Sequence, residues 1–174
     1  LVTRSGDVWT NSETSHRFAL YRKGTLRIVD GVAAPSRISE MVEGPDGSIW
    51  ARTANYDAEL LRFHDGQWRT FNAADGLPPS NVTNMLVAAD GAIWVACTSA
   101  VVGLAAGGAR FQTVGLTPRG ALSQDSQGRI WLSDDSGSYP LTGPGGRGQP
   151  PSMRTPYRTG AEQIQLGPLF DREG

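Results

Sequence analysis

A five-residue phrase, aspartate-glycine-small-isoleucine-tryptophan, occurs twice in this chain, at residues 46–50 and again at residues 90–94. Related phrases end at Trp9, as SGDVW, and at Trp131, as SQGRIW, so the four tryptophans stand about 40 residues apart. A period of this length indicates a repeat architecture in which each unit packs only against its neighbours. The content of one unit therefore decides which repeat fold the chain can adopt.

The unit at residues 79–116 consists of short apolar runs separated by Asp-Gly and Gly-Gly pairs, and the preceding unit follows the same plan. Such turn dipeptides between alternating runs predict hairpins, and hence four antiparallel strands per unit. No stretch shows helical periodicity over a useful length. Four strands in about 40 residues are typical of a β-propeller blade, so we predict an all-β propeller of about four blades. The turn pairs are Asp46-Gly47, Asp65-Gly66 and Asp90-Gly91.

The repeated tryptophan follows the turn that leads from the innermost strand of a blade to its second strand. A flat aromatic side chain at this position can pack against the neighbouring blade, and such burial stabilises the stack. An aromatic platform for a sugar is the alternative. We expect core positions for Trp9, Trp50, Trp94 and Trp131.

The whole chain is interpreted as one propeller domain or a fragment of one. Its end, QIQLGPLFDREG, resembles an innermost strand and its turn, and its start, LVTRSGDVW, enters at that same turn. The last strand could therefore complete the first blade and close the ring, because closure removes exposed edges. A piece of a larger ring and a homodimer stay open as alternatives. The predicted blades span roughly residues 1–34 (partial), 35–77, 78–117 and 118–158, with a partial strand at 159–174.

Composition excludes several classes of protein. The net charge is −1 with both signs scattered, which gives no basic surface for nucleic acid. No apolar run reaches about 18 residues, so we expect contact with a membrane only through other parts of a longer parent protein. Cys97 is the single cysteine, so neither an internal disulfide nor a Cys/His zinc cluster can form. We expect no metal and no cofactor.

The stretch at residues 65–98 resembles the two-component regulator propeller repeat. The resemblance implies an extracytoplasmic, periplasmic sensor domain of a histidine kinase or diguanylate cyclase, which binds a ligand and has no catalytic residues. It covers nearly the whole chain but is strongest in one blade. The residues that follow the repeat pattern there are Asp75, Gly76, Leu77, Pro78, Ser80, Asn81, Val82, Asp90, Gly91, Ile93, Trp94 and Thr98.

A second propeller family, the streptogramin lyase type, also places Gly-Pro-Asp-Gly before Ile-Trp. In that family the tryptophan is typically followed by Phe-Thr-Glu. Here Trp50 is followed by Ala-Arg-Thr, and Trp94 by Val-Ala-Cys. The acidic, metal-holding position is missing after these two tryptophans, which argues against the lyase.

Candidate ligand-binding residues stand on two sets of loops that line one face of a propeller, since function usually resides on loops that the scaffold leaves free. Arginine, asparagine and tyrosine side chains there could hold an anionic small molecule or a saccharide. The alternative is that they are solvated residues that cap turns. The candidates are Arg37, Asn55, Tyr56, Asn81, Arg119 and Asp134.

The two histidines, His16 and His64, have no serine or cysteine nearby that would suggest a nucleophile relay. Adjacent carboxylates at Asp134 and Asp135 would point to opposite faces of a strand, which suits neither acid–base catalysis nor a shared metal. We therefore predict a noncatalytic sensor domain of a bacterial signalling receptor. A lyase- or lactonase-type propeller enzyme and a protein-interaction scaffold remain the alternatives.

Overall fold

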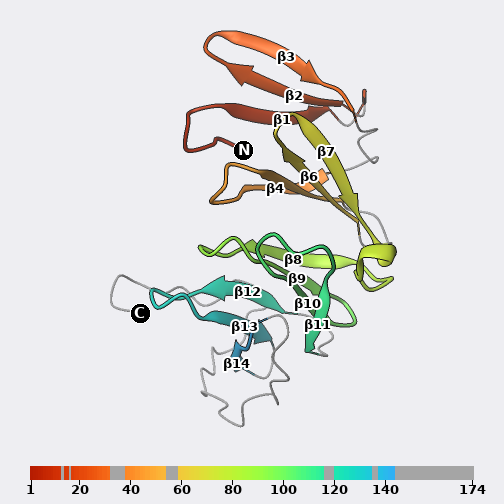
Figure 1. Cartoon of the computed structure of the whole chain (residues 1–174), viewed down its shortest axis with the longest axis vertical. Helices are drawn as coiled ribbons and strands as arrows, with labels where there is room; N and C mark the ends of the chain where they lie inside the picture. Colours follow the sequence, from red (N-terminus) through yellow and green to blue (C-terminus); the bar gives the residue numbers. More distant parts are fainter. Residues whose placement is uncertain are drawn as a thin grey trace, which may run out of the picture.

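The computed structural model describes residues 1–143, apart from residues 13, 16, 32–37, 54–58, 116–119 and 135–136, and leaves out residues 144–174. The described part consists almost entirely of antiparallel strands grouped into four sheets (Figure 1). Consecutive strands pair in chain order within every sheet. The predicted all-β architecture of small antiparallel sheets is confirmed.

Each sheet takes its strands from one sequence repeat. The first sheet contains β1 (Val8–Ser12), β2 (Arg17–Arg22) and β3 (Thr25–Val29), and the second contains β4 (Ile38–Glu43), β5 (Ile49–Thr53), β6 (Leu60–His64) and β7 (Gln67–Phe71). After the short 3-10 helix η1 (Ala73–Asp75), the third contains β8 (Val82–Val87), β9 (Ile93–Cys97), β10 (Val101–Leu104) and β11 (Gln112–Gly115). The fourth contains β12 (Ala121–Gln124), β13 (Ile130–Asp134) and β14 (Gly137–Leu141).

The four sheets stack face to face in chain order, with the first and fourth at opposite ends of the stack (Figure 1). The first strands of the second, third and fourth sheets, β4, β8 and β12, are called inner strands below. β4 contacts β8, and β8 contacts β12. One apolar cluster fills each of the three spaces between sheets. The core is thus divided into layers, as nearest-neighbour packing in a repeat fold requires.

The repeated tryptophans lie in these layers. Trp9, Trp50 and Trp94 are each only 3% exposed, and each faces the sheet that follows it in the chain. Trp131 of the fourth sheet is half-buried. The prediction that these tryptophans are packing residues is confirmed for the first three.

Asp-Gly pairs form two different turns. At residues 44–48 the Gly47 N–H donates to the Gly44 carbonyl, and only the glycine has a positive φ, of 77°. This is a three-residue loop with a bulge at the glycine, and the turn at Gly91 repeats it. At the β6–β7 hairpin both Asp65 and Gly66 have positive φ, as a two-residue type I′ turn demands. The dipeptide predicts a turn but not which of the two forms.

Residues 1–3 run beside β1 on the edge that an inner strand occupies in the other sheets. Val2 pairs with Val8, and the Trp9 N–H donates to the Leu1 carbonyl at 2.8 Å. Part of this edge is therefore already paired by the N-terminal residues. The predicted closing strand at residues 159–174 lies outside the described residues, and ring closure stays a prediction.

Candidate functional site

Most of the predicted ligand-binding residues lie outside the described part of the chain. This holds for Arg37, Asn55, Tyr56 and Arg119, and also for His16 and Asp135. The other two candidates belong to different sheets, since Asn81 directly precedes β8 and Asp134 ends β13. The structure therefore leaves the predicted loop site as a prediction.

Asn81 and Asp134 are both half-buried and both engaged with the scaffold. The main-chain carbonyl of Asn81, just before β8, accepts the Thr98 N–H at 2.9 Å. The carboxylate of Asp134, at the end of β13, accepts the Tyr139 hydroxyl at 2.9 Å. Hydrogen bonds of this kind hold loop ends in place, which is compatible with either a ligand contact or a turn cap.

Arg52, at the end of β5, belongs to the same region and was not predicted from the sequence. Its guanidinium donates to the Val82 carbonyl at 2.8 Å and to Glu40 at 3.1 Å, and its side chain is only 18% exposed. The side chain thus ties the second sheet to the third beside the loop ends. Its signal in the sequence was its place two residues after Trp50, on the face that meets the next sheet.

Two β-bulges occupy equivalent positions on neighbouring inner strands. The register of β4 shifts between Ile38 and Glu40, and that of β8 shifts between Val82 and Asn84. The extra residues are Ser39 and Thr83, whose hydroxyls donate to carbonyls of β5 and β9 respectively. Bulges re-aim side chains and are common beside binding sites, so this end of the inner strands is specialised in both sheets.

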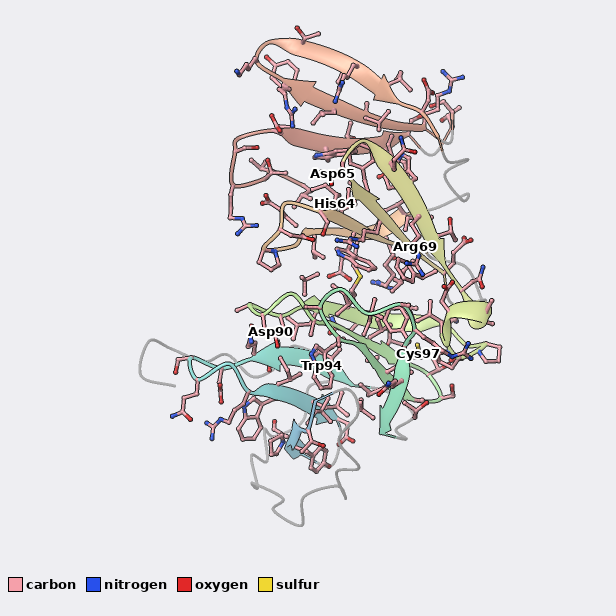
Figure 2. All side chains as sticks on the ribbon, viewed as in Figure 1. His64, Asp65, Arg69, Asp90, Trp94 and Cys97 are labelled. Atoms are coloured by element: carbon pink, nitrogen blue, oxygen red, sulfur yellow. The ribbon has the colours of Figure 1, made fainter. Side chains whose placement is uncertain are left out.

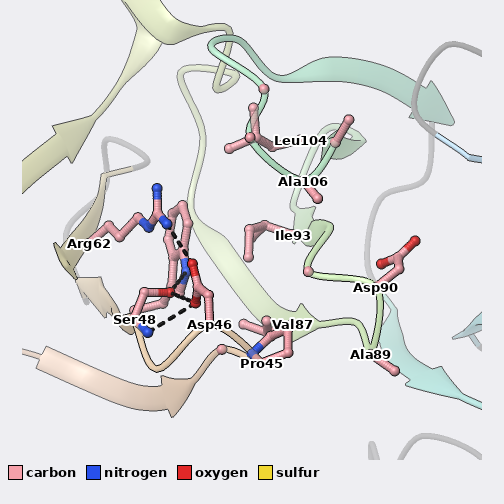
Figure 3. Close-up of a pocket in the computed structure, with 16 residues that line it drawn as sticks. Pro45, Asp46, Ser48, Arg62, Val87, Ala89, Asp90, Ile93, Leu104 and Ala106 are labelled. Atoms are coloured by element: carbon pink, nitrogen blue, oxygen red, sulfur yellow. Dashed lines mark hydrogen bonds and ion pairs between the residues drawn. The ribbon is translucent and has the colours of Figure 1, made fainter. Parts of the chain in front are cut away.

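The opposite end of the second and third sheets contains a groove of about 380 Å³ (Figure 3). The turns after β4 and β8 and the β10–β11 turn surround it. Its lining combines apolar side chains with two carboxylates and one guanidinium. Among the lining residues are Asp46, Trp50, Arg62, Asp90, Ile93 and Leu104.

Asp46 is fixed at the rim of this groove by several donors. It accepts the Ser48 N–H at 3.0 Å, the Ser48 hydroxyl at 2.6 Å and the Arg62 guanidinium at 2.7 Å. Partial burial raises the pKa of this carboxyl, but the hydrogen bonds from Ser48 and Arg62 outweigh burial and lower the pKa to about 2. Arg62 also lies over the Trp50 ring, 5.5 Å from its centroid. Asp46 is therefore ionised at neutral pH and, with so low a pKa, is a weak base there.

His64 and Cys97 are two further side chains that could take part in chemistry. His64 lies 3.3 Å from Asp65 and 4.0 Å from Asp46, at the outer hairpin of the second sheet (Figure 2). Burial raises the pKa of the Cys97 thiol to about 11, although a hydrogen bond with Ser80 acts in the opposite direction. Within the described ranges, no group of three or more His, Cys, Asp or Glu side chains is placed to hold a metal ion. No helix in that part is long and apolar enough to cross a bilayer.

No protein-family model matches the chain, and no curated protein matches it. Solved structures do match. Virginiamycin B lyase from Staphylococcus aureus is 14% identical with a TM-score of 0.68, over 91% of this chain and 55% of the lyase. The chain has the β-propeller fold. It spans about half the length of the lyase chains that it matches.

Two further similar structures represent two functional classes. The extracellular domain of a protein named as a hybrid two-component system of B. thetaiotaomicron is 16% identical with a TM-score of 0.56, over 76% of this chain and 19% of that one. A protein named as a gluconolactonase is 18% identical with a TM-score of 0.55, over 81% of this chain and 58% of that one. Identities this low show the fold and leave the function open.

Proposed function

We propose that this chain is the ligand-sensing, noncatalytic propeller domain of a bacterial two-component or cyclic-dinucleotide signalling receptor. The observation that carries the proposal is the agreement between two independent signs. Residues 65–98 resemble the two-component regulator repeat, and the fold is similar to extracellular domains of two-component systems. The same similarity supports an extracytoplasmic, periplasmic location for this domain.

The ligand is proposed to be a saccharide or a small anion bound at the loop ends that flank the bulged inner strands. In this proposal the Asn81 amide and the Asp134 carboxylate contact the ligand, and Arg37 and Arg119 supply positive charge. Bidentate and planar side chains of these kinds recognise carboxylates, phosphates and sugar hydroxyls. The scaffold is held by Arg52, whose two hydrogen bonds join neighbouring sheets beneath the loops.

A lyase- or lactonase-type enzyme is the second candidate, and one observation favours it. Asp134 stands three residues after Trp131, at the place where the lyase family carries its acidic residue. The equivalent positions in the second and third sheets are Thr53 and Cys97, so the acidic residue occurs after one of these three tryptophans only. A single carboxylate that is hydrogen-bonded to Tyr139 supports binding better than catalysis.

A binding screen with a parallel activity assay tests the proposal. Thermal shift and calorimetry with neutral sugars, sugar acids and small phosphates should identify a ligand that raises the melting temperature, while lactones and streptogramins should not be consumed. Asn81→Ala and Asp134→Asn should weaken ligand binding severalfold. Asp65→Asn, at an exposed outer turn, is the matched control and should bind normally.

Two results would redirect the assignment. Turnover of a lactone or streptogramin that is lost in Asp134→Asn would establish the enzyme. Binding that is insensitive to both loop-end variants would place the ligand elsewhere. The receptor part of the proposal has its own test, because the parent gene should encode a transmembrane helix and a kinase or cyclase module.

A further inference from the structure

The exposed large apolar side chains of the described residues gather on one face of the first sheet. The strand register places four of them in one row across the sheet, since Val2 pairs with Val8, Val8 with Tyr21, and Tyr21 with Leu26. Ile28 extends the row along β3, and Leu26 is 62% exposed. A contiguous apolar surface of this kind marks an interaction site. The row and Ile28 are called the outer face below.

The second sheet shows what such a row binds. Its equivalent row runs through Ile49, Phe63 and Trp68, paired across the strands in the same way. Trp9 of the preceding sheet packs on this row, with ring centroids 5.0 Å from Phe63 and 6.2 Å from Trp68. Phe18, on the same side as Trp9, lies 4.4 Å from Trp68. The row therefore accepts the tryptophan-bearing face of another sheet.

The pattern recurs along the stack. Trp50 shares a buried cluster with Ile93 and Leu104 of the third sheet, and Trp94 shares one with Ile130 of the fourth. Every described sheet after the first thus receives the tryptophan side of its predecessor. The outer face of the first sheet carries the same row and, among the described residues, receives nothing.

We propose that the outer face binds the fourth sheet of a second copy of this chain, head to tail. The fourth sheet carries Trp131 at the position of Trp9, and it lies at the far end of the stack from the first sheet (Figure 1). The inference is independent of the proposed ligand.

The repeat fixes which residues meet. Phe18 pairs with the residue two positions after Trp9, and Ser138 pairs with the residue two positions after Trp131. Ser138 is therefore the equivalent of Phe18 in the fourth sheet. Transferring the observed contact of Phe18 with Trp68 therefore places Ser138 of one copy against Leu26 of the other. The contact of Trp9 with Phe63 likewise places Trp131 against Tyr21. A two-fold axis repeats this contact at the other end and closes both copies into one ring, in which each end sheet is covered by a sheet of the other copy.

Cysteine cross-linking tests this arrangement directly. Cys97 is buried with a pKa of about 11, so the thiols introduced by Leu26→Cys and Ser138→Cys are the reactive ones. A mixture of the two single variants should be joined into a covalent dimer by a short bis-maleimide linker, because facing sheets lie about 10 Å apart, and neither variant alone should be joined efficiently. Dimers of Leu26→Cys alone would mean that two outer faces meet, which overturns the head-to-tail arrangement.

The oligomeric state supplies a second readout with a matched control. By size-exclusion chromatography with light scattering, the chain should be a dimer, and Leu26→Glu should convert it to a folded monomer. Thr25→Glu places the same charge on the neighbouring residue of β3, on the opposite side of the sheet, and should leave the dimer intact. If the unmutated chain is monomeric at all concentrations, the proposal is wrong. Its outer face is then covered by another part of the same chain or is left exposed.

Discussion

The third and first sheets are built from the same repeat but differ in burial. All five residues of β9 are buried, because the second sheet covers one face and the fourth sheet covers the other. In β1, the equivalent strand of the first sheet, only Trp9 is buried. The difference is visible in the sequence. All five residues of β9, IWVAC, are apolar, whereas in β1, VWTNS, the three residues after the tryptophan are polar. Burial in this fold is therefore set by the number of neighbouring sheets.

Truncating the third-sheet tryptophan should give the largest effect. Trp94 is 3% exposed and lies between two sheets, so Trp94→Ala removes a large aromatic group and leaves a cavity. We expect a loss of about 3–5 kcal/mol in the free energy of unfolding, measured by urea denaturation. Tyr21→Ala in the first sheet should cost under about 1 kcal/mol in the monomeric Leu26→Glu background, because it changes an exposed side chain. Equal losses at the two positions would refute the layered core.

A glycine pair extends the comparison to the backbone. Gly76, which ends η1 before the third sheet, has φ 92°, and an added Cβ would lie 2.4 Å from the Phe111 carbonyl oxygen. Gly6, in the first sheet's turn, has φ 83° but open space around it. Gly6→Ala should cost about 1–2 kcal/mol through the left-handed backbone alone. Gly76→Ala should cost about 1–3 kcal/mol more through steric overlap, and chemical denaturation of both variants measures the difference.

Much of this architecture was predictable because its signals are local. Asp-Gly turns, alternating strands and the recurring tryptophan each depend on a few adjacent residues, and together they predicted sheet type, strand order and the packing of Trp9, Trp50 and Trp94. The two forms of the Asp-Gly turn were not distinguishable, since the form depends on the strands that the turn joins.

The missed features depend on contacts between distant residues. The role of Arg52 requires the Val82 carbonyl, which reaches it only when the second and third sheets stack. The residue types at Ser39 and Thr83 do not predict the register shifts that produce the two bulges. The candidate ligand site is predicted only as a set of loop residues, because its members come from different repeats and most lie outside the described part.

An inter-sheet hydrogen bond should give an intermediate effect. The Asn84 side-chain carbonyl accepts the Leu122 N–H at 2.8 Å and so joins the inner strands of the third and fourth sheets. Asn84→Ala leaves that N–H without its partner, and we expect a loss of about 1–2 kcal/mol by chemical denaturation. Gln124→Ala removes two bonds at exposed positions, one accepted from the Ala89 N–H at 3.0 Å and one donated to the Gly128 carbonyl at 3.1 Å. It should still cost less, because water can replace both partners. A larger loss for Gln124→Ala than for Asn84→Ala would contradict the expectation that water replaces the hydrogen-bond partners of Gln124.

The smallest effect concerns the turn of the second sheet at low pH. The pKa of Asp46 falls from its ordinary 3.8 to about 2 in the folded chain, so its stabilising contribution is complete above about pH 4 and is lost as the pH falls through 2. Asp46→Asn lacks this contribution, but the carboxylate is nearly half exposed, so the variant should lose at most about 1 kcal/mol at neutral pH. The free energies of unfolding of the unmutated chain and of Asp46→Asn, measured by denaturation at a series of pH values, should converge between pH 4 and 2. A constant gap across that range would mean that the asparagine change acts through the shape of the turn and that the charge of Asp46 is immaterial.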